Sequence, residues 1–190
     1  MKALVMSAAL GLACLSANAS ADWNLIDDES RLWFGSVKNE SVGETHVVGS
    51  LTGHIDDDGK VAIEATTASL DSGIDIRDER MQEHLFPTPS LAISSNLDPT
   101  QFASLMPGNT LLARVPVSVT LGAAGSDYDA TVMVVRLSES RWLVVSDQPI
   151  WVDASSLGLV QGIATLQDIA GLSSIARTSP VGFRLLFESP

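Results

Sequence analysis

The side chains that could do chemistry in this sequence are three histidines and a large set of carboxylates. His46, His54 and His84 stand eight and thirty residues apart, and no HxH or HxxxH pair places two of them together. Zinc sites and nucleophilic catalysis need such ligand pairs or a recognisable nucleophile. The sequence contains no GxSxG, CxxC, phosphate-binding loop or dinucleotide fingerprint. We interpret the histidines as surface or turn residues and predict no metal site.

The carboxylates do not define a site either. Asp56-Asp57-Asp58-Gly59 begins like a calcium loop but lacks the glutamate expected at the twelfth position, which favours a hairpin tip. Asp75 with Asp78, or Asp78 with Glu79, could act as acid and base only at a separation that the sequence does not set. The sequence thus argues against an enzyme and favours a binding module. A site that buries an apolar ligand needs few polar groups and leaves almost no motif.

The elements that would build such a site are mainly β-strands. Apolar and polar residues alternate over much of the chain, which indicates strands with one buried face. Asp58-Gly59 between two such runs predicts a hairpin, and Pro116 within a strand predicts an edge or a bulge. The alternating segments are Val47–Ile55, Val61–Ala65, Leu111–Leu121, Thr131–Leu137 and Val181–Phe187.

Three segments break the β pattern. Ile76–Leu85 has good helix formers and is followed by Pro87, so we predict a helix there. The second half of Ser155–Ile175 has helical spacing, with Gly171 as its stop, and Asp98–Phe102 resembles a helix start or turn. About eight strands with short inserted helices predict an antiparallel barrel or sandwich. A closed eight-stranded barrel has room inside for one elongated ligand.

Residues 1–21 have the features of an export signal. Lys2 precedes an apolar stretch, and Ala19-Ser20-Ala21 fits a signal-peptidase site before Asp22. Ala17-Asn18-Ala19 is a competing site. This apolar stretch is too short to span a bilayer comfortably, and the sequence has no second long apolar stretch. We therefore predict a cleaved signal peptide, a periplasmic location and no stable membrane insertion.

Composition supports a single folded domain over residues 22–190. The chain has 190 residues, of which 45% are hydrophobic, and Cys14 is its only cysteine. Its 11 lysines and arginines face 23 aspartates and glutamates, for a formal charge of −12. Nucleic acids and anionic lipid surfaces attract proteins through lysine and arginine, so we expect neither as a partner.

Four segments together resemble the YceI family, and they span about residues 22–189. The most specific is a strand end followed by an Arg-Asp pair, a leucine and a phenylalanine. A divergence lies in the turn after Val152, where Asp153 and Leu157 replace the family's asparagine and phenylalanine. The four segments are Trp23–Phe34 (WNLIDDESRLWF), Asn39–Gly53, Asp71–Phe86 (DSGIDIRDERMQEHLF) and Val152–Leu159.

The resemblance implies an extended, lipocalin-like antiparallel β-barrel in an exported bacterial protein. It also implies a small-molecule lipid partner, a long isoprenoid, quinone-like or other amphiphilic chain held in the barrel, and no catalytic cofactor. The alternative is a structural or stress-response protein whose barrel is filled by side chains. We interpret Arg77 and Asp78 as fixing the strand-to-helix junction in preference to contacting a lipid head group.

Strand alternation allows a choice of the residues that face the interior. Where the opposite parity is more polar, the apolar parity is predicted to line the ligand channel. Two further residues are expected to form the wall on the helix side. The predicted ligand-binding residues are Leu51, Ile63, Leu85, Phe86, Val117, Val119, Met133 and Phe183.

Overall fold

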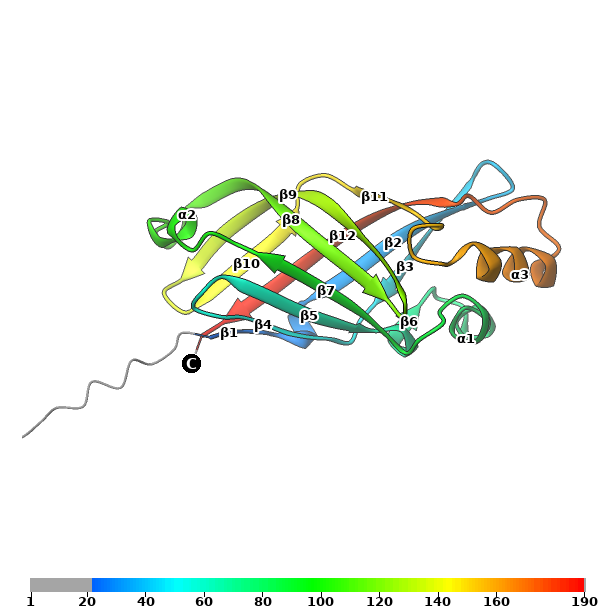
Figure 1. Ribbon diagram of the computed structural model, residues 1–190, viewed down its shortest axis with the longest axis horizontal. Helices are drawn as coiled ribbons and strands as arrows, with labels where there is room; N and C mark the ends of the chain where they lie inside the picture. The colour runs from blue at the N-terminus through cyan, green and yellow to red at the C-terminus, as the bar shows by residue number, and fades with distance from the viewer. Residues whose placement is uncertain (1–21, 190) are drawn as a thin grey trace, which may run out of the picture.

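The alternating segments of the sequence form strands in the structure, a computed structural model that describes residues 22–189. Within this range twelve strands make one sheet, and the molecule is elongated (Figure 1). Eight of the strands close into a ring. In ring order these are β1 (Trp23–Leu25), β4 (Leu51–Ile55), β5 (Lys60–Thr66), β7 (Ser90–Asn96), β8 (Thr110–Leu121), β9 (Ala124–Ser138), β10 (Arg141–Ser146) and β12 (Thr178–Glu188).

The short strand β1 closes the barrel. It pairs on one side with β4, where Trp23 lies opposite Ile55, and on the other with β12, where Leu25 lies opposite Phe187. All neighbouring strands in the ring are antiparallel. The structure therefore confirms the predicted antiparallel barrel, and ring closure removes the open edges that a sandwich would leave.

Four further strands lengthen the barrel at one end. Because β12 is eleven residues long, its C-terminal half pairs with β10 while its N-terminal half pairs with β2 and β11. The pairing continues from β2 to β3 and β6, so this wall extends beyond the ring. The four strands are β2 (Arg31–Lys38), β3 (Val42–Val48), β6 (Leu70–Asp71) and β11 (Ile150–Asp153).

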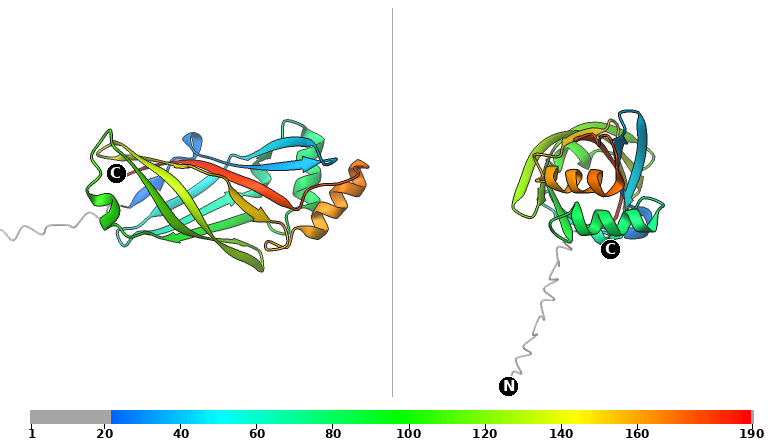
Figure 2. Two further views of the ribbon diagram at one scale, coloured as in Figure 1. Left: turned by 90° about the horizontal axis from the view of Figure 1, so that it is seen from above. Right: turned by 90° about the vertical axis from the view of Figure 1, so that its right-hand side faces the viewer.

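Two helices lie across the extended end. α1 (Asp75–His84) and α3 (Val160–Ala170) pack side by side there, and α2 (Thr100–Ala103) lies at the opposite end (Figure 2). Single 3₁₀ turns, η1 (Asp27–Glu29) and η2 (Thr67–Ser69), connect strands. Gly171 ends α3 in the left-handed conformation, with φ of 62°, as its position in the sequence predicted.

The predicted hairpin is present at Asp58-Gly59. The Asp56 carboxylate accepts a hydrogen bond from the Lys60 backbone N–H at 2.8 Å, and Gly59 has a φ of 81°. This carboxylate therefore serves the turn between β4 and β5. The alternating run from Val47 to Ile55 is not one strand, because it breaks at Gly49 and its two halves pair with different partners.

Pro116 lies on β8 beyond the end of its pairing with β7. The last pair of that ladder is Ser94 with Ser118, so at Pro116 β8 is paired with β9 but lies outside the ladder with β7. A residue without an N–H is tolerated there, as the sequence predicted.

Candidate ligand-binding cavity

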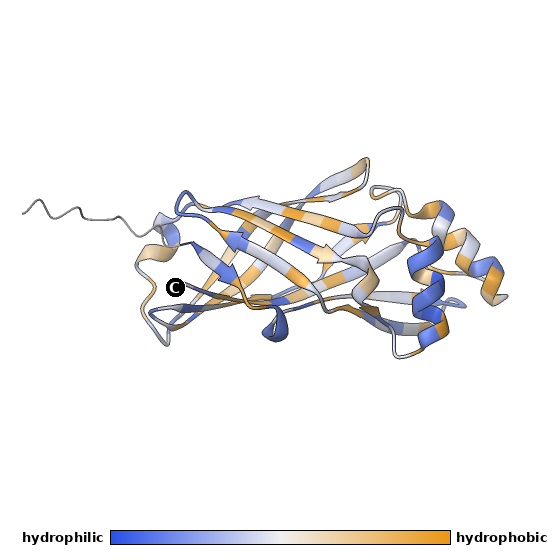
Figure 3. Cartoon of the chain, turned by 90° about the horizontal axis from the view of Figure 1, so that it is seen from below, coloured by the Kyte–Doolittle hydropathy of each residue, from blue (hydrophilic) through white to orange (hydrophobic). Residues whose placement is uncertain are grey.

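The strands place one apolar face toward the barrel axis. Along β8, half-buried Val115, Val117 and Val119 alternate with exposed residues, and on β9 Val132 and Val134 are buried. Figure 3 shows the same alternation of hydrophilic and hydrophobic residues along the strands. These apolar side chains surround open space instead of meeting across the axis.

Two adjoining cavities occupy the interior. The first, the tryptophan-end cavity, has a volume of about 370 Å³, and the second, the helix-end cavity, about 510 Å³. Their sizes are in the range of small-molecule sites. The cavities share four lining residues, so together they form a long apolar space with a waist. The shared residues are Leu32, Ile93, Val117 and Phe183.

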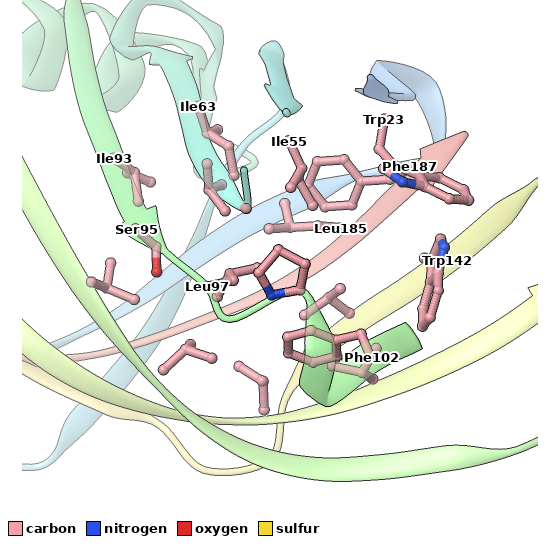
Figure 4. A pocket seen from close by; sticks show the side chains of 18 of the residues that line it. Trp23, Ile55, Ile63, Ile93, Ser95, Leu97, Phe102, Trp142, Leu185 and Phe187 are labelled. Carbon is pink, nitrogen blue, oxygen red and sulfur yellow. The ribbon is translucent and has the colours of Figure 1, made fainter. Parts of the chain in front are cut away.

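The tryptophan-end cavity is lined by large apolar side chains from β1, β10 and α2. Trp23 and Trp142 are in edge-to-face contact at 5.7 Å between ring centroids (Figure 4). The Arg136 guanidinium lies 4.7 Å from the centroid of the Trp142 ring. Phe102 of α2 points into the same space. The only other charged residues in this lining are Asp56 and Asp57.

The helix-end cavity has a polar corner. Lys38 of β2 donates a hydrogen bond to Glu44 Oε1 of β3 at 2.7 Å, and Arg77 Nη2 of α1 lies 3.1 Å from the same oxygen. His46 of β3 is only 2% exposed, and its Nε2 is hydrogen-bonded to Ser36 Oγ at 2.8 Å. Its Nδ1 is buried with no hydrogen-bond partner among the described residues.

The surroundings lower the pKa of two groups in this corner, Glu44 and His46. Burial raises the pKa of Glu44, but the hydrogen bond from Lys38 and the charge of Arg77 outweigh it, so the pKa is lowered. Burial and the nearby Arg77 lower the pKa of His46, against the opposing charges of Glu44 and Asp78. His46 is therefore neutral at neutral pH, and Glu44 is ionised.

The Arg-Asp pair of α1 is divided between two roles. The Asp78 carboxylate accepts the backbone N–H of Ser72 at 2.9 Å and so fixes the turn before the helix. Arg77 points toward Glu44 and lines the helix-end cavity. The junction role we expected thus belongs to Asp78, while Arg77 belongs to the cavity wall.

Seven of the eight predicted ligand-binding residues line the cavities. Leu51 and Ile63 line the tryptophan-end cavity, and Val117 and Phe183 line both. The other three line the helix-end cavity. They are Leu85, Phe86 and Val119.

The choice of Met133 is wrong. Met133 is 39% exposed on the outer face of β9, and its neighbours Val132 and Val134 face the interior instead. Both parities of this strand are apolar, so alternation alone did not separate them. The β8–β9 register would have done so, because it pairs Leu111 with Val134 and Leu112 with Met133. Cross-strand partners share a face.

The interpretation of the histidines is wrong for His46. It lies in the wall of the helix-end cavity, while His54 is exposed and His84 is half-buried at the end of α1. Among residues 22–189, no group of three or more histidine, cysteine or acidic side chains is placed to hold a metal ion. Trp142, Phe102 and Arg80 also line the cavities and were not identified from the sequence.

A closed barrel around a long apolar cavity, with helices across one end, is a lipocalin-like architecture. A polyisoprenoid-binding domain from Saccharophagus degradans, implicated in plant cell wall breakdown, is 32% identical to the chain, with a TM-score of 0.85. The match covers 88% of this chain and 98% of that domain. The chain belongs to the YceI family.

A second structure, Burkholderia cenocepacia BcnA, shares the fold at 15% identity. Its TM-score is 0.58, and the match covers 85% of this chain and 98% of BcnA. No protein-family model matches the chain, and no curated protein matches it at a significant level. No helix within residues 22–189 is both long and apolar enough to cross a bilayer. The signal peptide predicted at 1–21 lies outside the described residues and stays a prediction.

Proposed function

We propose that the protein is a non-enzymatic carrier that binds a long isoprenoid or similar amphiphilic lipid in its barrel and transports it in the periplasm. The observation that carries this proposal is the pair of adjoining apolar cavities along the barrel axis. Burial of a hydrocarbon chain contributes about 0.8 kcal/mol per methylene, so a long chain needs no charged anchor to bind tightly. The 32% identical Saccharophagus domain, described as polyisoprenoid-binding, supports the same ligand class.

The alternative is a structural or stress-response protein with a filled barrel. In a filled barrel the inward side chains of β8 and β12 would meet across the axis. Val117 and Phe183 instead border both cavities, which favours the carrier.

Val119→Trp tests the proposal. Val119 lines the helix-end cavity, so the larger side chain should occupy ligand space and abolish lipid binding. Thr120→Trp is the matched control, since Thr120 is the exposed neighbour on the same strand and should leave binding unchanged. The measurement is native mass spectrometry of protein isolated from the periplasm, with displacement of a fluorescent isoprenoid as a second assay.

The thermal stability of Val119→Trp distinguishes a hollow barrel that carries a ligand from a barrel filled by side chains. In a hollow barrel Val119→Trp should leave the melting temperature nearly unchanged, whereas in a packed core overpacking would cost about 1–3 kcal/mol. A wild-type protein that binds no isoprenoid, together with a strongly destabilised variant, would refute the carrier function.

A further inference from the structure

The outer face of the barrel carries an apolar patch on β8, β9 and β10, three neighbouring strands (Figure 1). Leu112 and Met133 are cross-strand partners there, and they are 59% and 39% exposed. Val145 of β10 lies opposite Met133 on the other side of β9. Because cross-strand partners share a face, these side chains form one surface that points away from the cavities. This surface, the β9 patch, consists of Leu112, Met133, Val135, Leu143 and Val145.

The strands are apolar on both faces at the β9 patch. Val132 and Val134, on either side of Met133 in the sequence, face the interior. Further along β8 and β9 the outward residues are polar, namely Ser118, Thr120, Asp127 and Asp129. Strands that are apolar on both faces are typical of sheets covered on both faces. The described chain leaves Leu112 and Met133 exposed, so the sequence of these strands indicates a partner on this face.

Two opposite charges flank the β9 patch on either side of Thr131. Arg114 of β8 is the cross-strand partner of Thr131. Asp147, just past β10, donates its backbone N–H to the Thr131 carbonyl oxygen at 2.9 Å. Both side chains are exposed, and within residues 22–189 neither has an ion-pair or side-chain hydrogen-bond partner. The patch therefore has an unpaired cation on one flank and an unpaired anion on the other.

This arrangement matches itself about a two-fold axis that runs along β9. Rotation about such an axis exchanges the β8 side with the β10 side. Arg114 of one copy then faces Asp147 of the other, and the reverse contact forms by symmetry. The same rotation places Leu112 against Val145, while Met133, on the axis, meets its own counterpart. A two-fold interface must match one surface with itself, and the β9 patch does so in both charge and apolar character.

We propose that the β9 patch is the interface of a reversible homodimer, in which Arg114 and Asp147 form two symmetric ion pairs. An anionic lipid surface would repel Asp147 together with the rest of the acidic chain, whereas a second copy pairs it. Sheets packed face to face cross at about 30°, so the copies diverge beyond Thr131. Asp129, the next outward residue of β9, therefore stays clear of its counterpart. The proposal does not depend on the carrier function, because the cavities lie on the inner faces of these strands.

Exchange of the two flanking charges tests the pairing. In sedimentation equilibrium from about 1 to about 100 µM, the mature wild type should pass from monomer to dimer, since a small patch gives a weak interface. Arg114→Asp or Asp147→Arg alone should weaken dimerisation at least about ten-fold, because each creates two like-charge contacts. The double variant Arg114→Asp/Asp147→Arg should return to within about three-fold of wild type. Glu64→Arg, an exposed position on β5 with the same change in net charge as Asp147→Arg, should leave dimerisation unchanged.

Chemical cross-linking locates the axis. Cys14, in the predicted signal peptide, is the only cysteine, so an introduced cysteine is the only thiol of the mature protein. Packed sheets lie about 10 Å apart, too far for a direct disulfide between facing backbones but within reach of a short bismaleimide. Thr131→Cys, on the axis, should give a covalent dimer with this reagent. Thr120→Cys, exposed on β8 beyond the patch, should stay monomeric.

Three outcomes would overturn the proposal. The first is a wild type that stays monomeric at about 100 µM. The second is a dimer that either single charge exchange leaves intact, or that the double exchange does not restore in variants whose melting temperatures equal that of the wild type. The third is a monomer that binds phosphatidylethanolamine–phosphatidylglycerol vesicles and loses this binding in Met133→Asp, which would assign the patch to a membrane surface.

Discussion

At the scale of single residues, His46 belongs to a polar group in the cavity wall that forms only when β2, β3 and α1 come together. Its neighbours in sequence, Thr45 and Val47, are less buried, and alternation alone did not mark it as internal. Its surroundings depend on β2, the preceding strand, which brings Ser36 to it, and on α1, further along the chain, which brings Arg77 near it. A single sequence carries no signal of that encounter, so the polar corner was not predictable from it.

The lowered pKa of His46 predicts a pH dependence of stability. Below its ordinary value of about 6.5, the histidine takes up a proton in the unfolded chain before it does so in the folded protein. The unfolded state then binds more protons, so the free energy of unfolding falls as the pH drops below about 6.5. Glu44, whose folded pKa is also lowered, adds a further loss below about 4.5.

His46→Gln should remove the first of these losses. We expect its free energy of unfolding, from urea titrations, to vary less between pH 7.5 and 5.5 than that of the wild type. His54→Gln, at an exposed histidine, should keep the wild-type slope. Equal slopes for wild type and His46→Gln would contradict the prediction.

At the scale of elements, local signals predicted strands and helix ends better than they predicted which face is buried. The hairpin turn at Asp58-Gly59 and the helix end at Gly171 lie where the sequence predicted them, and Gly59 and Gly171 both have a positive φ. Alternation could not decide the inward face around Met133, because β9 is apolar on both sides there, and only its pairing with β8 decides the face. The division of β12 between two sets of partners also depends on long-range pairing, which alternation does not encode.

The corrected orientation of β9 predicts unequal costs for two adjacent truncations. Val132→Ala, at a side chain only 1% exposed, should lower the free energy of unfolding by about 1–2 kcal/mol because it removes buried methyl groups. Met133→Ala, on the outer face, should change it by less than about 0.5 kcal/mol. Chemical denaturation measures both, and a larger loss for Met133→Ala would restore the original orientation.

The packing of α1 against α3 depends on Gly162. A Cβ at this position would lie 2.5 Å from the His84 carbonyl oxygen and 2.8 Å from the Leu85 Cα. Although alanine is the better helix former, Gly162→Ala should destabilise the fold by about 1–3 kcal/mol because the backbone of α1 must move.

Gly43→Ala is the control for that substitution, since a Cβ there meets nothing within 4 Å and should cost little. Thermal melts of the two variants make the comparison. A Gly162→Ala protein as stable as Gly43→Ala would show that the two helices do not pack closely at this point.

At the scale of the whole molecule, the acidic exterior and the hollow apolar interior are separate properties. The family resemblance and the alternation anticipated a barrel, whereas the polar corner of its helix-end cavity emerges only when α1 is placed against β2 and β3. Net charge far from zero favours solubility, and a carrier that moves lipid through water needs that property.

The predicted signal peptide gives an expected first residue for the mature chain. N-terminal sequencing of the periplasmic protein should read from Asp22, or from Ser20 if the competing site is used. The expected mass loss is that of the leader peptide. An intact Met1 in the periplasmic fraction, or retention of the protein in the cytoplasm, would contradict the prediction.

A lipid bound inside the barrel should raise the free energy of unfolding of the whole domain. A ligand that binds only the folded state stabilises it by about 2.7 kcal/mol when its free concentration is a hundred times Kd. For a domain of this size that corresponds to a rise in melting temperature of about 5–10 °C. Delipidated wild type and Thr120→Trp should both show the rise with a saturating isoprenoid, measured by calorimetry. Val119→Trp should not, because its cavity is blocked. The same rise in Val119→Trp as in wild type would mean that the lipid binds outside the helix-end cavity.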